Sequence, residues 1–156
     1  MTRIRIALAV PLAALAFAGC GGDDAPSKEE FAEAADKVCA DLEKQTQNLG
    51  RPENVEEIQT FAQELRKTAE DAVSKVEDLE VPEGDDGEKA EQWKNAVKDE
   101  AENQLLPAVE ELEKAAEAND EKAIVEAAQK IDQLEATESD RLAKELGLKE
   151  CGESSA

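Results

Sequence analysis

The sequence contains no histidine and no tyrosine. Histidine is the commonest general base in enzymes and the commonest side-chain ligand of transition metals. Its absence excludes a histidine-dependent catalytic triad, and it excludes the di-iron carboxylate bundles that need a Glu-x-x-His motif. We therefore predict no catalytic residues, no metal site and no cofactor, and an enzyme is the least favoured class of function.

Aromatic residues and strand-like patterns are also scarce. After the first 19 residues the only aromatic side chains are Phe31, Phe61 and Trp93. They could line a ligand pocket, but Phe31 and Trp93 lie on apolar helical stripes and Phe61 lies beside one, which favours core packing. No segment alternates apolar and polar residues with β-branched side chains, so we expect no sheet.

Basic residues are outnumbered by acidic ones. The chain has 18 Lys and Arg against 39 Asp and Glu, for a net charge of −21. Removal of residues 1–19 takes away two arginines and no acid, which leaves a mature chain of −23. Such a charge repels nucleic acid and anionic lipid head groups, so we expect no nucleic-acid partner.

Long apolar runs are absent except at the N-terminus. Thr2-Arg3-Ile4-Arg5 precedes an apolar stretch over residues 6–18, which is shorter than the roughly 20 residues of a spanning helix. A basic start, a short apolar run and small residues at its end are typical of a secretory signal peptide. Ala18-Gly19-Cys20 resembles a bacterial lipobox, which predicts cleavage before Cys20 and a lipid on that residue. Ala16-Phe17-Ala18 also fits an ordinary signal peptidase site, so simple secretion remains the alternative.

Two further cysteines remain, Cys39 and Cys151. An even pair in an exported chain predicts one disulfide, because free thiols persist poorly in an oxidising compartment. Two unpaired thiols are the other possibility.

Apolar periodicity predicts four helices. Ser27-Lys28-Glu29-Glu30 is a capping box that starts the first helix, which ends at Gly50. The second runs from about Asn54 and is stopped by Pro82, and the third runs from about Glu88 to Ala118 with Pro107 inside it. We expect Pro107 to kink this helix, and a break into two near Leu106 is the lesser possibility. The fourth runs from Asn119-Asp120 to about Glu145, and its stripe is interrupted at Thr137-Glu138, which we interpret as an exposed end in preference to a cavity.

Short loops between long helices imply an up-down antiparallel four-helix bundle over residues 27–151. Residues 1–19 precede it as the signal peptide, residues 20–26 form a short tether from the lipidated Cys20, and residues 152–156 form a loose tail. The first and last helices would be neighbours, so the predicted Cys39–Cys151 bond would tie the C-terminus to the first helix. Alanine is frequent on the stripes; such small residues either let helices approach closely or leave space for a ligand, and both readings stay open.

Three short motifs carry a resemblance to known proteins. They are Cys20-Gly-Gly-Asp-Asp after the signal, Phe31 to Cys39 with the pattern Phe-x-x-x-Ala-Asp-x-Val-Cys, and the closing Gly147-Leu148-Lys149-Glu150-Cys151. Together they resemble a group of small actinobacterial lipoproteins with a helical domain and an early and a late cysteine. Phe17 departs from the leucine that most lipoboxes have three residues before the cysteine. The resemblance implies a fold and an address on the outer face of the plasma membrane, and no activity.

Two classes of function follow from these observations. The first is a lipid-anchored interaction module that binds a protein or another component of the cell envelope. The alternative is a carrier of a small ligand or cation, with a pocket between helices. Residues 83–88 form an acidic loop, but they lack the Asp-x-Asp-x-Asp-Gly spacing of a calcium loop, so we interpret them as a solvated turn with Asp85 or Asp86 as the N-cap.

Overall fold

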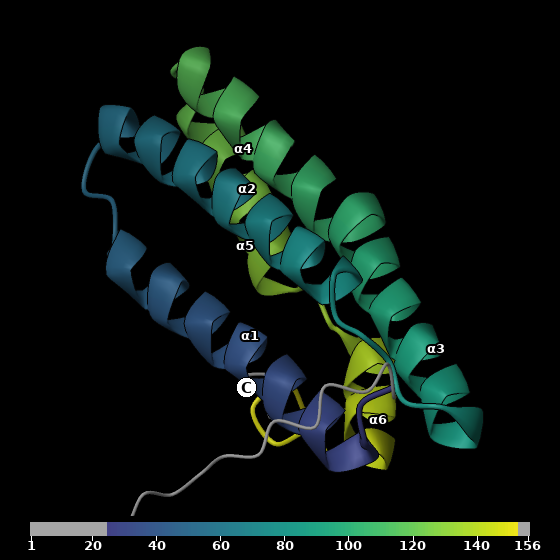
Figure 1. Ribbon diagram of the computed structural model, residues 1–156. Coiled ribbons are helices and arrows are strands. Elements are labelled where there is room, and N and C mark those ends of the chain that lie inside the picture. Colours follow the sequence, from purple (N-terminus) through teal and green to yellow (C-terminus); the bar gives the residue numbers. More distant parts are fainter. Residues whose placement is uncertain (1–24, 153–156) are drawn as a thin grey trace, which may run out of the picture.

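The computed structural model describes residues 25–152, and every regular element in that range is helical. The predicted signal peptide, Cys20 and residues 153–156 lie outside this range. The elements in chain order are α1 (Lys28–Leu49), α2 (Val55–Glu77), α3 (Gly84–Glu100), the π-helix η1 (Ala101–Leu105), α4 (Leu106–Glu117), α5 (Glu121–Asp132) and α6 (Thr137–Leu146). Figure 1 shows α3, η1 and α4 following one another as a single long rod. The prediction of an all-helical domain is confirmed.

The first two helices begin where their capping residues predict. The Ser27 hydroxyl accepts a hydrogen bond from the Glu30 N–H at 3.2 Å, and the Glu30 carboxylate accepts one from the Ser27 N–H at 2.8 Å. This is the predicted capping box. At the start of α2, the Asn54 side chain accepts from the Glu57 N–H at 3.0 Å, so both helices satisfy an N–H group that would otherwise lack a partner.

The third helix begins earlier than predicted, at Gly84 instead of about Glu88. The expectation that Asp85 or Asp86 would cap it is therefore wrong, since both lie in its first turn, where negative charge favours the helix dipole. Asp86 also forms an ion pair with Lys28 of α1, at 3.1 Å. Gly87 lies so close to the preceding loop that a Cβ there would stand 2.0 Å from the Pro82 carbonyl oxygen.

Pro107 lies in a helix that does not break. The chain stays helical from α3 to α4, and the turn before the proline widens into η1. The Leu106 N–H donates to the Ala101 carbonyl, five residues back. A wider turn of this kind accommodates a residue that cannot donate a hydrogen bond and whose ring crowds the preceding turn. The predicted continuity is confirmed, and the mechanism is a π-helical turn.

The predicted fourth helix is wrong as a single element, because residues 133–136 separate α5 from α6. Thr137 and Glu138 are exposed, as predicted, but they form the first turn of α6 and not the end of a helix. Gly152, placed by prediction in the loose tail, is buried.

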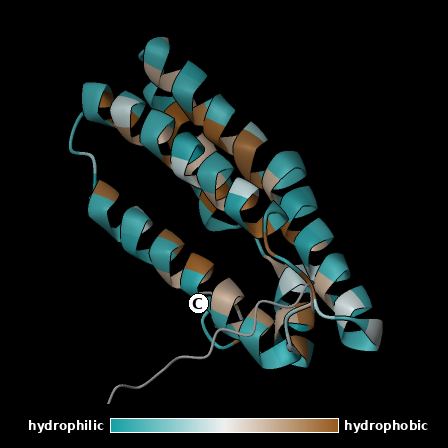
Figure 2. Ribbon diagram, viewed as in Figure 1, coloured by the Kyte–Doolittle hydropathy of each residue, from teal (hydrophilic) through white to brown (hydrophobic). Residues whose placement is uncertain are grey.

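The helices pack through α2 and α4. Helix α2 packs on α1 and on α4. Helix α4 also packs on α5, and α3 packs on α6. One core joins α1, α2, α3 and α6 around Phe31 and Trp93, whose rings meet edge to face at 5.9 Å; we call it the Trp93 core. A second, the Val109 core, joins α2, α4 and α5. In Figure 2 the hydrophobic residues of neighbouring helices largely face one another and the outer faces are mostly hydrophilic.

An ion pair reinforces the α2–α4 contact. The Arg66 guanidinium donates two hydrogen bonds to the Glu113 carboxylate, at 3.0 and 2.5 Å. This two-point geometry favours the charged form and raises the pKa of Arg66. Within residues 25–152, no helix combines the length and apolar character needed to cross a membrane.

Candidate functional site

A cavity of about 610 Å³ lies between the two cores. We call it the interhelix cavity. Its wall comes from every α-helix, from η1 and from the segment between α5 and α6, and most of the exposed lining is carbon. The lining residues are Val38, Cys39, Leu42, Thr46, Phe61, Leu65, Ala69, Ala72, Val73, Val76, Trp93, Val97, Glu100, Ala101, Gln104, Leu105, Leu112, Ala128, Ile131, Asp132, Leu134, Glu135, Ala136, Ser139, Asp140 and Cys151.

The cavity is elongated along α2. Its lining residues on that helix extend from Phe61 to Val76, which at 1.5 Å per residue corresponds to about 22 Å. Much of this wall is built from small residues, among them Ala69 and Ala72. An alanine on the inner face of a helix leaves room that a leucine would fill, so the alanine-rich stripe accounts for part of the space.

The cover over this wall is the second half of α1. The first half of that helix is fixed in the Trp93 core by Phe31 and Ala35, which are 1% and 0% exposed. Beyond Cys39 the inward residues Leu42 and Thr46 are only partly buried or exposed, and both line the cavity. In Figure 1 this part of α1 runs beside α2, and its last residue, Leu49, packs against the Val109 core.

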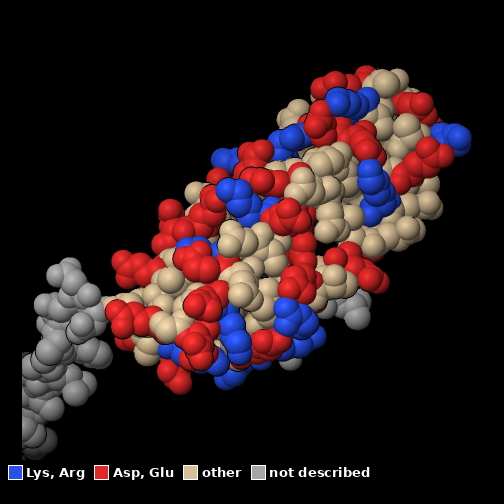
Figure 3. Space-filling model, turned by 90° about the vertical axis from the view of Figure 1, so that its right-hand side faces the viewer, with Lys and Arg blue, Asp and Glu red and all other residues tan. Residues whose placement is uncertain are grey.

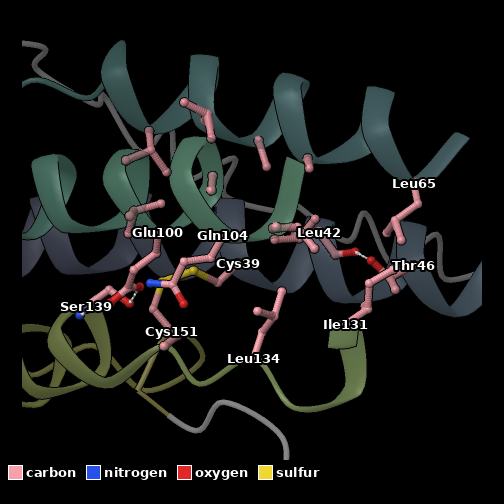
Figure 4. A pocket seen from close by; sticks show the side chains of 18 of the residues that line it. Cys39, Leu42, Thr46, Leu65, Glu100, Gln104, Ile131, Leu134, Ser139 and Cys151 are labelled. Atoms are coloured by element: carbon pink, nitrogen blue, oxygen red, sulfur yellow. Dashed lines mark hydrogen bonds between the residues drawn. A yellow bond between two sulfur atoms is a disulfide. The ribbon is translucent and has the colours of Figure 1, made fainter. Parts of the chain in front are cut away.

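One end of the cavity is polar. There the Glu100 carboxylate accepts hydrogen bonds from the N–H groups of Glu138 and Ser139, both at 3.2 Å, and from the Ser139 hydroxyl at 2.5 Å. Figure 4 shows Glu100 and Ser139 at one end and Leu65, Thr46 and Ile131 at the other. Because Ala136, the residue before α6, offers no capping side chain, Glu100 supplies from a distant helix the acceptor that the first turn of α6 needs.

The charged side chains of the lining are all acidic. Four carboxylates, Glu100, Asp132, Glu135 and Asp140, lie among the described lining residues, and no lysine or arginine does. Figure 3 shows one outer face of the molecule, where acidic side chains are spread over most of its length with basic ones between them. Both the wall and that face therefore carry more negative than positive groups.

The disulfide closes the same polar end. The sulfurs of Cys39 and Cys151 are bonded, as predicted, and both residues line the cavity. Close by, the Asp36 carboxylate accepts from the N–H groups of Lys149 and Glu150, both at 2.9 Å. The early motif around Ala35-Asp36 and the late motif ending at Cys151 thus meet in space. We call this arrangement the C-terminal clasp, made of Asp36, Cys39 and residues 147–151.

The aromatic residues, Cys20 and the acidic clusters were also considered from the sequence. Phe31 and Trp93 pack in the core as predicted, although Trp93 also borders the cavity, and Phe61 lines it while remaining partly exposed. Cys20 lies outside the described residues. Within residues 25–152, no cluster of three or more Cys, Asp or Glu side chains has a geometry that could hold a metal ion.

Sequence reasoning did not identify Glu100 as a site residue. It lies seven residues after Trp93, on the same face of the predicted third helix as the apolar stripe, but its partner Ser139 is 39 positions away. Two signals were available: a carboxylate on the apolar face at Glu100, and the interrupted stripe at Thr137-Glu138, for which a cavity was the less favoured interpretation. Compared with family models, with curated proteins and with solved structures, the chain has no match.

Proposed function

We propose that the mature protein is a non-catalytic binding protein of the cell envelope that holds an apolar small molecule in the interhelix cavity. The observation that carries this proposal is the cavity itself. Its volume of about 610 Å³ falls within the roughly 300–1,000 Å³ of small-molecule sites, which are mostly apolar with a few polar groups. Helical bundles place such sites between their helices.

The proposal includes an up-down arrangement of four helical rods: α1, α2, the α3–α4 rod, and α5 with α6. The interhelix cavity would then occupy the central space of this bundle, on the side where α1 is less tightly packed. A ligand there would complete the core that the Trp93 and Val109 cores leave incomplete between them. The cavity favours the small-ligand carrier, which was the alternative from the sequence, over the interaction module.

A protein partner has less support in the described residues. Val125 is the exposed large hydrophobic side chain in residues 25–152, at 53% exposure. A single exposed apolar residue is ordinary on a protein surface and does not mark an interface. We therefore keep partner binding as the second candidate without assigning it a surface.

The address rests on the N-terminal motif. We propose that Cys20 carries lipid and holds the domain on the outer face of the plasma membrane, as in the lipoproteins that the sequence resembles. Residues 20–26 span at most about 25 Å, so the helices would lie close to the bilayer. Cys20→Ala should move the protein from the membrane fraction to the soluble one. A Cys20→Ala protein that has lost its signal peptide and yet stays in the membrane fraction would overturn the anchoring.

Ligand binding can be tested with a neutral apolar fluorophore, N-phenyl-1-naphthylamine, and the tryptophan of the protein. Trp93 is the single tryptophan of the chain and borders the cavity. A probe in the cavity should accept excitation energy from Trp93, saturate at one per protein and raise the melting temperature. No saturable transfer, together with an unchanged melting temperature, would overturn the proposal.

Two matched variants localise the site. Ala72→Phe places a ring in the cavity wall, whereas Ala34→Phe adds the same ring at an exposed position of α1 that does not line it. We expect the first variant to weaken probe binding at least about tenfold and the second to leave it unchanged. Equal binding by both variants would place the probe elsewhere.

A further inference from the structure

We infer that the ligand of the interhelix cavity is a linear amphiphile with a cationic head, such as an alkyl ammonium, held with its head near Glu100. This inference rests on the proposed function and adds the shape, the charge and the orientation of the ligand. It follows from three features of the cavity: its length, the sign of its charged groups and the place of the hydrogen-bonded Glu100 at one end.

The length argues for a chain and not a compact molecule. The wall follows α2 from Phe61 to Val76, about 22 Å along the helix axis. At the far end Leu65 and Ile131 face the space, and the Thr46 hydroxyl donates to the Leu42 carbonyl at 3.0 Å. Asp132 follows Ile131 in the chain and also borders the cavity, but it is exposed. An alkyl chain finds carbon contacts along this length and leaves no polar group of its own unpaired.

The sign of charge argues against an anion. All four charged side chains in the wall are carboxylates, and a mature chain of −23 adds a field of the same sign. The charged groups that a fatty acid carboxylate would meet in this wall are carboxylates of the same sign, and this repulsion costs free energy. An ammonium group in the same place gains both a hydrogen-bond acceptor and an opposite charge.

The position of the acceptors orients the ligand. Glu100 is held by the two N–H groups of Glu138 and Ser139 and by the Ser139 hydroxyl. A carboxylate offers about four acceptor positions, so these three donors leave one, on the Oε2 atom. Figure 4 places the Gln104 side chain beside Glu100 at this end, near the Cys39–Cys151 disulfide. The head of the ligand would therefore lie near the C-terminal clasp and its chain would point toward Leu65.

Competition among three ten-carbon amphiphiles tests the sign. Decylammonium, decanol and decanoate, each below its micelle concentration, displace N-phenyl-1-naphthylamine while energy transfer from Trp93 is followed. We expect decylammonium to displace half of the probe at a concentration at least about tenfold below that of decanoate, with decanol between them. This difference in concentration should narrow as salt is added. If decanol or decanoate displaces the probe as well as decylammonium, the cationic head is refuted and the proposed function stands. If the fluorophore itself does not bind, both fail.

Two charge-matched variants separate the cavity from the general surface. Glu100→Gln and Glu102→Gln each remove one negative charge, but Glu102 is exposed and does not line the cavity. We expect Glu100→Gln to reduce the advantage of decylammonium over decanol several-fold and Glu102→Gln to preserve it. Equal effects of the two variants would assign the preference to net charge and overturn the placement near Glu100.

The affinity for decanol reports whether the variants keep the cavity. Because Glu100 also holds the first turn of α6, Glu100→Gln could alter the wall as well as its charge. If decanol binding falls, Glu135→Gln takes its place, since Glu135 lines the cavity from the segment between α5 and α6 and is exposed. The inference is refuted if the decylammonium preference survives Glu100→Gln with decanol binding intact. Where Glu100→Gln lowers decanol binding, survival of the preference in Glu135→Gln refutes it.

Discussion

Removal of the disulfide should cost this domain a large part of its stability. Cys39 and Cys151 are 112 residues apart in the sequence, so the bond closes a loop over most of the described chain. In the chain-entropy model a loop of about 100 residues contributes about 4.7 kcal/mol by restricting the unfolded chain. Domains of this size unfold at a cost of about 5–15 kcal/mol. We expect the double variant Cys39→Ser, Cys151→Ser to lose about 4–5 kcal/mol.

Urea unfolding measures this loss. With a slope of about 2 kcal/mol per molar urea, which is ordinary for a small protein, the midpoint should fall by about 2 M. The slope itself should rise, because an unfolded chain without the cross-link exposes more surface. The wild-type protein unfolded in the presence of reductant is the control, and it should match the double variant. A loss below about 1 kcal/mol would refute the reasoning, since it would mean that the unfolded chain gains little freedom when the bond is removed.

Four further outcomes follow from the structure. Gly87→Ala should cost about 1–3 kcal/mol in urea unfolding, because its Cβ would overlap the Pro82 carbonyl oxygen; a neutral result would mean that the loop moves away freely. Asp36→Ala should cost about 1.5–3 kcal/mol in urea unfolding, because it removes a charged acceptor from the C-terminal clasp. Asp36→Asn should cost less, because its amide oxygen still accepts hydrogen bonds. Equal losses in the two variants would contradict the role of the acceptor. The N–H and hydroxyl of Ser27 lower the pKa of Glu30 below its ordinary 4.5. The stabilisation from these hydrogen bonds is therefore complete above pH 4.5 and is lost as pH falls through the lower folded pKa. The melting-temperature difference between wild type and Ser27→Ala should shrink toward about pH 2.5, and a constant difference would contradict the role of the Glu30 carboxylate. Because a chain with a net charge of −21 repels itself, the unfolding midpoint should rise from low to moderate salt. A fall would contradict the prediction.

The parts of the fold that were predictable are those set by neighbours in the sequence. The capping box at Ser27, the cap at Asn54 and the apolar period of the first two helices depend on residues three or four positions apart. The Cys39–Cys151 pair was predictable for another reason: with Cys20 assigned to the predicted lipobox, two of the three cysteines remained in a chain predicted to be exported. At Pro107 the local rule identified the perturbed turn but did not specify the π-helical turn that accommodates the proline.

The start of α6 depends on a residue that no local pattern connects to it. Thr137-Glu138 interrupts an apolar stripe, and Ala136 gives no capping signal, so the sequence does not indicate a new helix there. The missing acceptor comes from Glu100, 38 and 39 positions earlier. Prediction from periodicity extends a helix through such a point, because the long-range contact that permits the break has no counterpart in the local sequence.

The interhelix cavity follows from how the two cores are spaced, and that spacing is a property of the whole fold. The Trp93 core fixes the first half of α1, and the Val109 core fixes α2 against α4 and α5. Between them, small side chains such as Ala69 and Ala72 of α2 and residues of the second half of α1 line the same space. The same alanines would have closed the gap had α1 packed as closely as α4 does, which is why composition left both readings open. A ligand that fills this space would gain the contacts that α1 lacks, so binding should tighten the second half of α1 as well as the wall it covers.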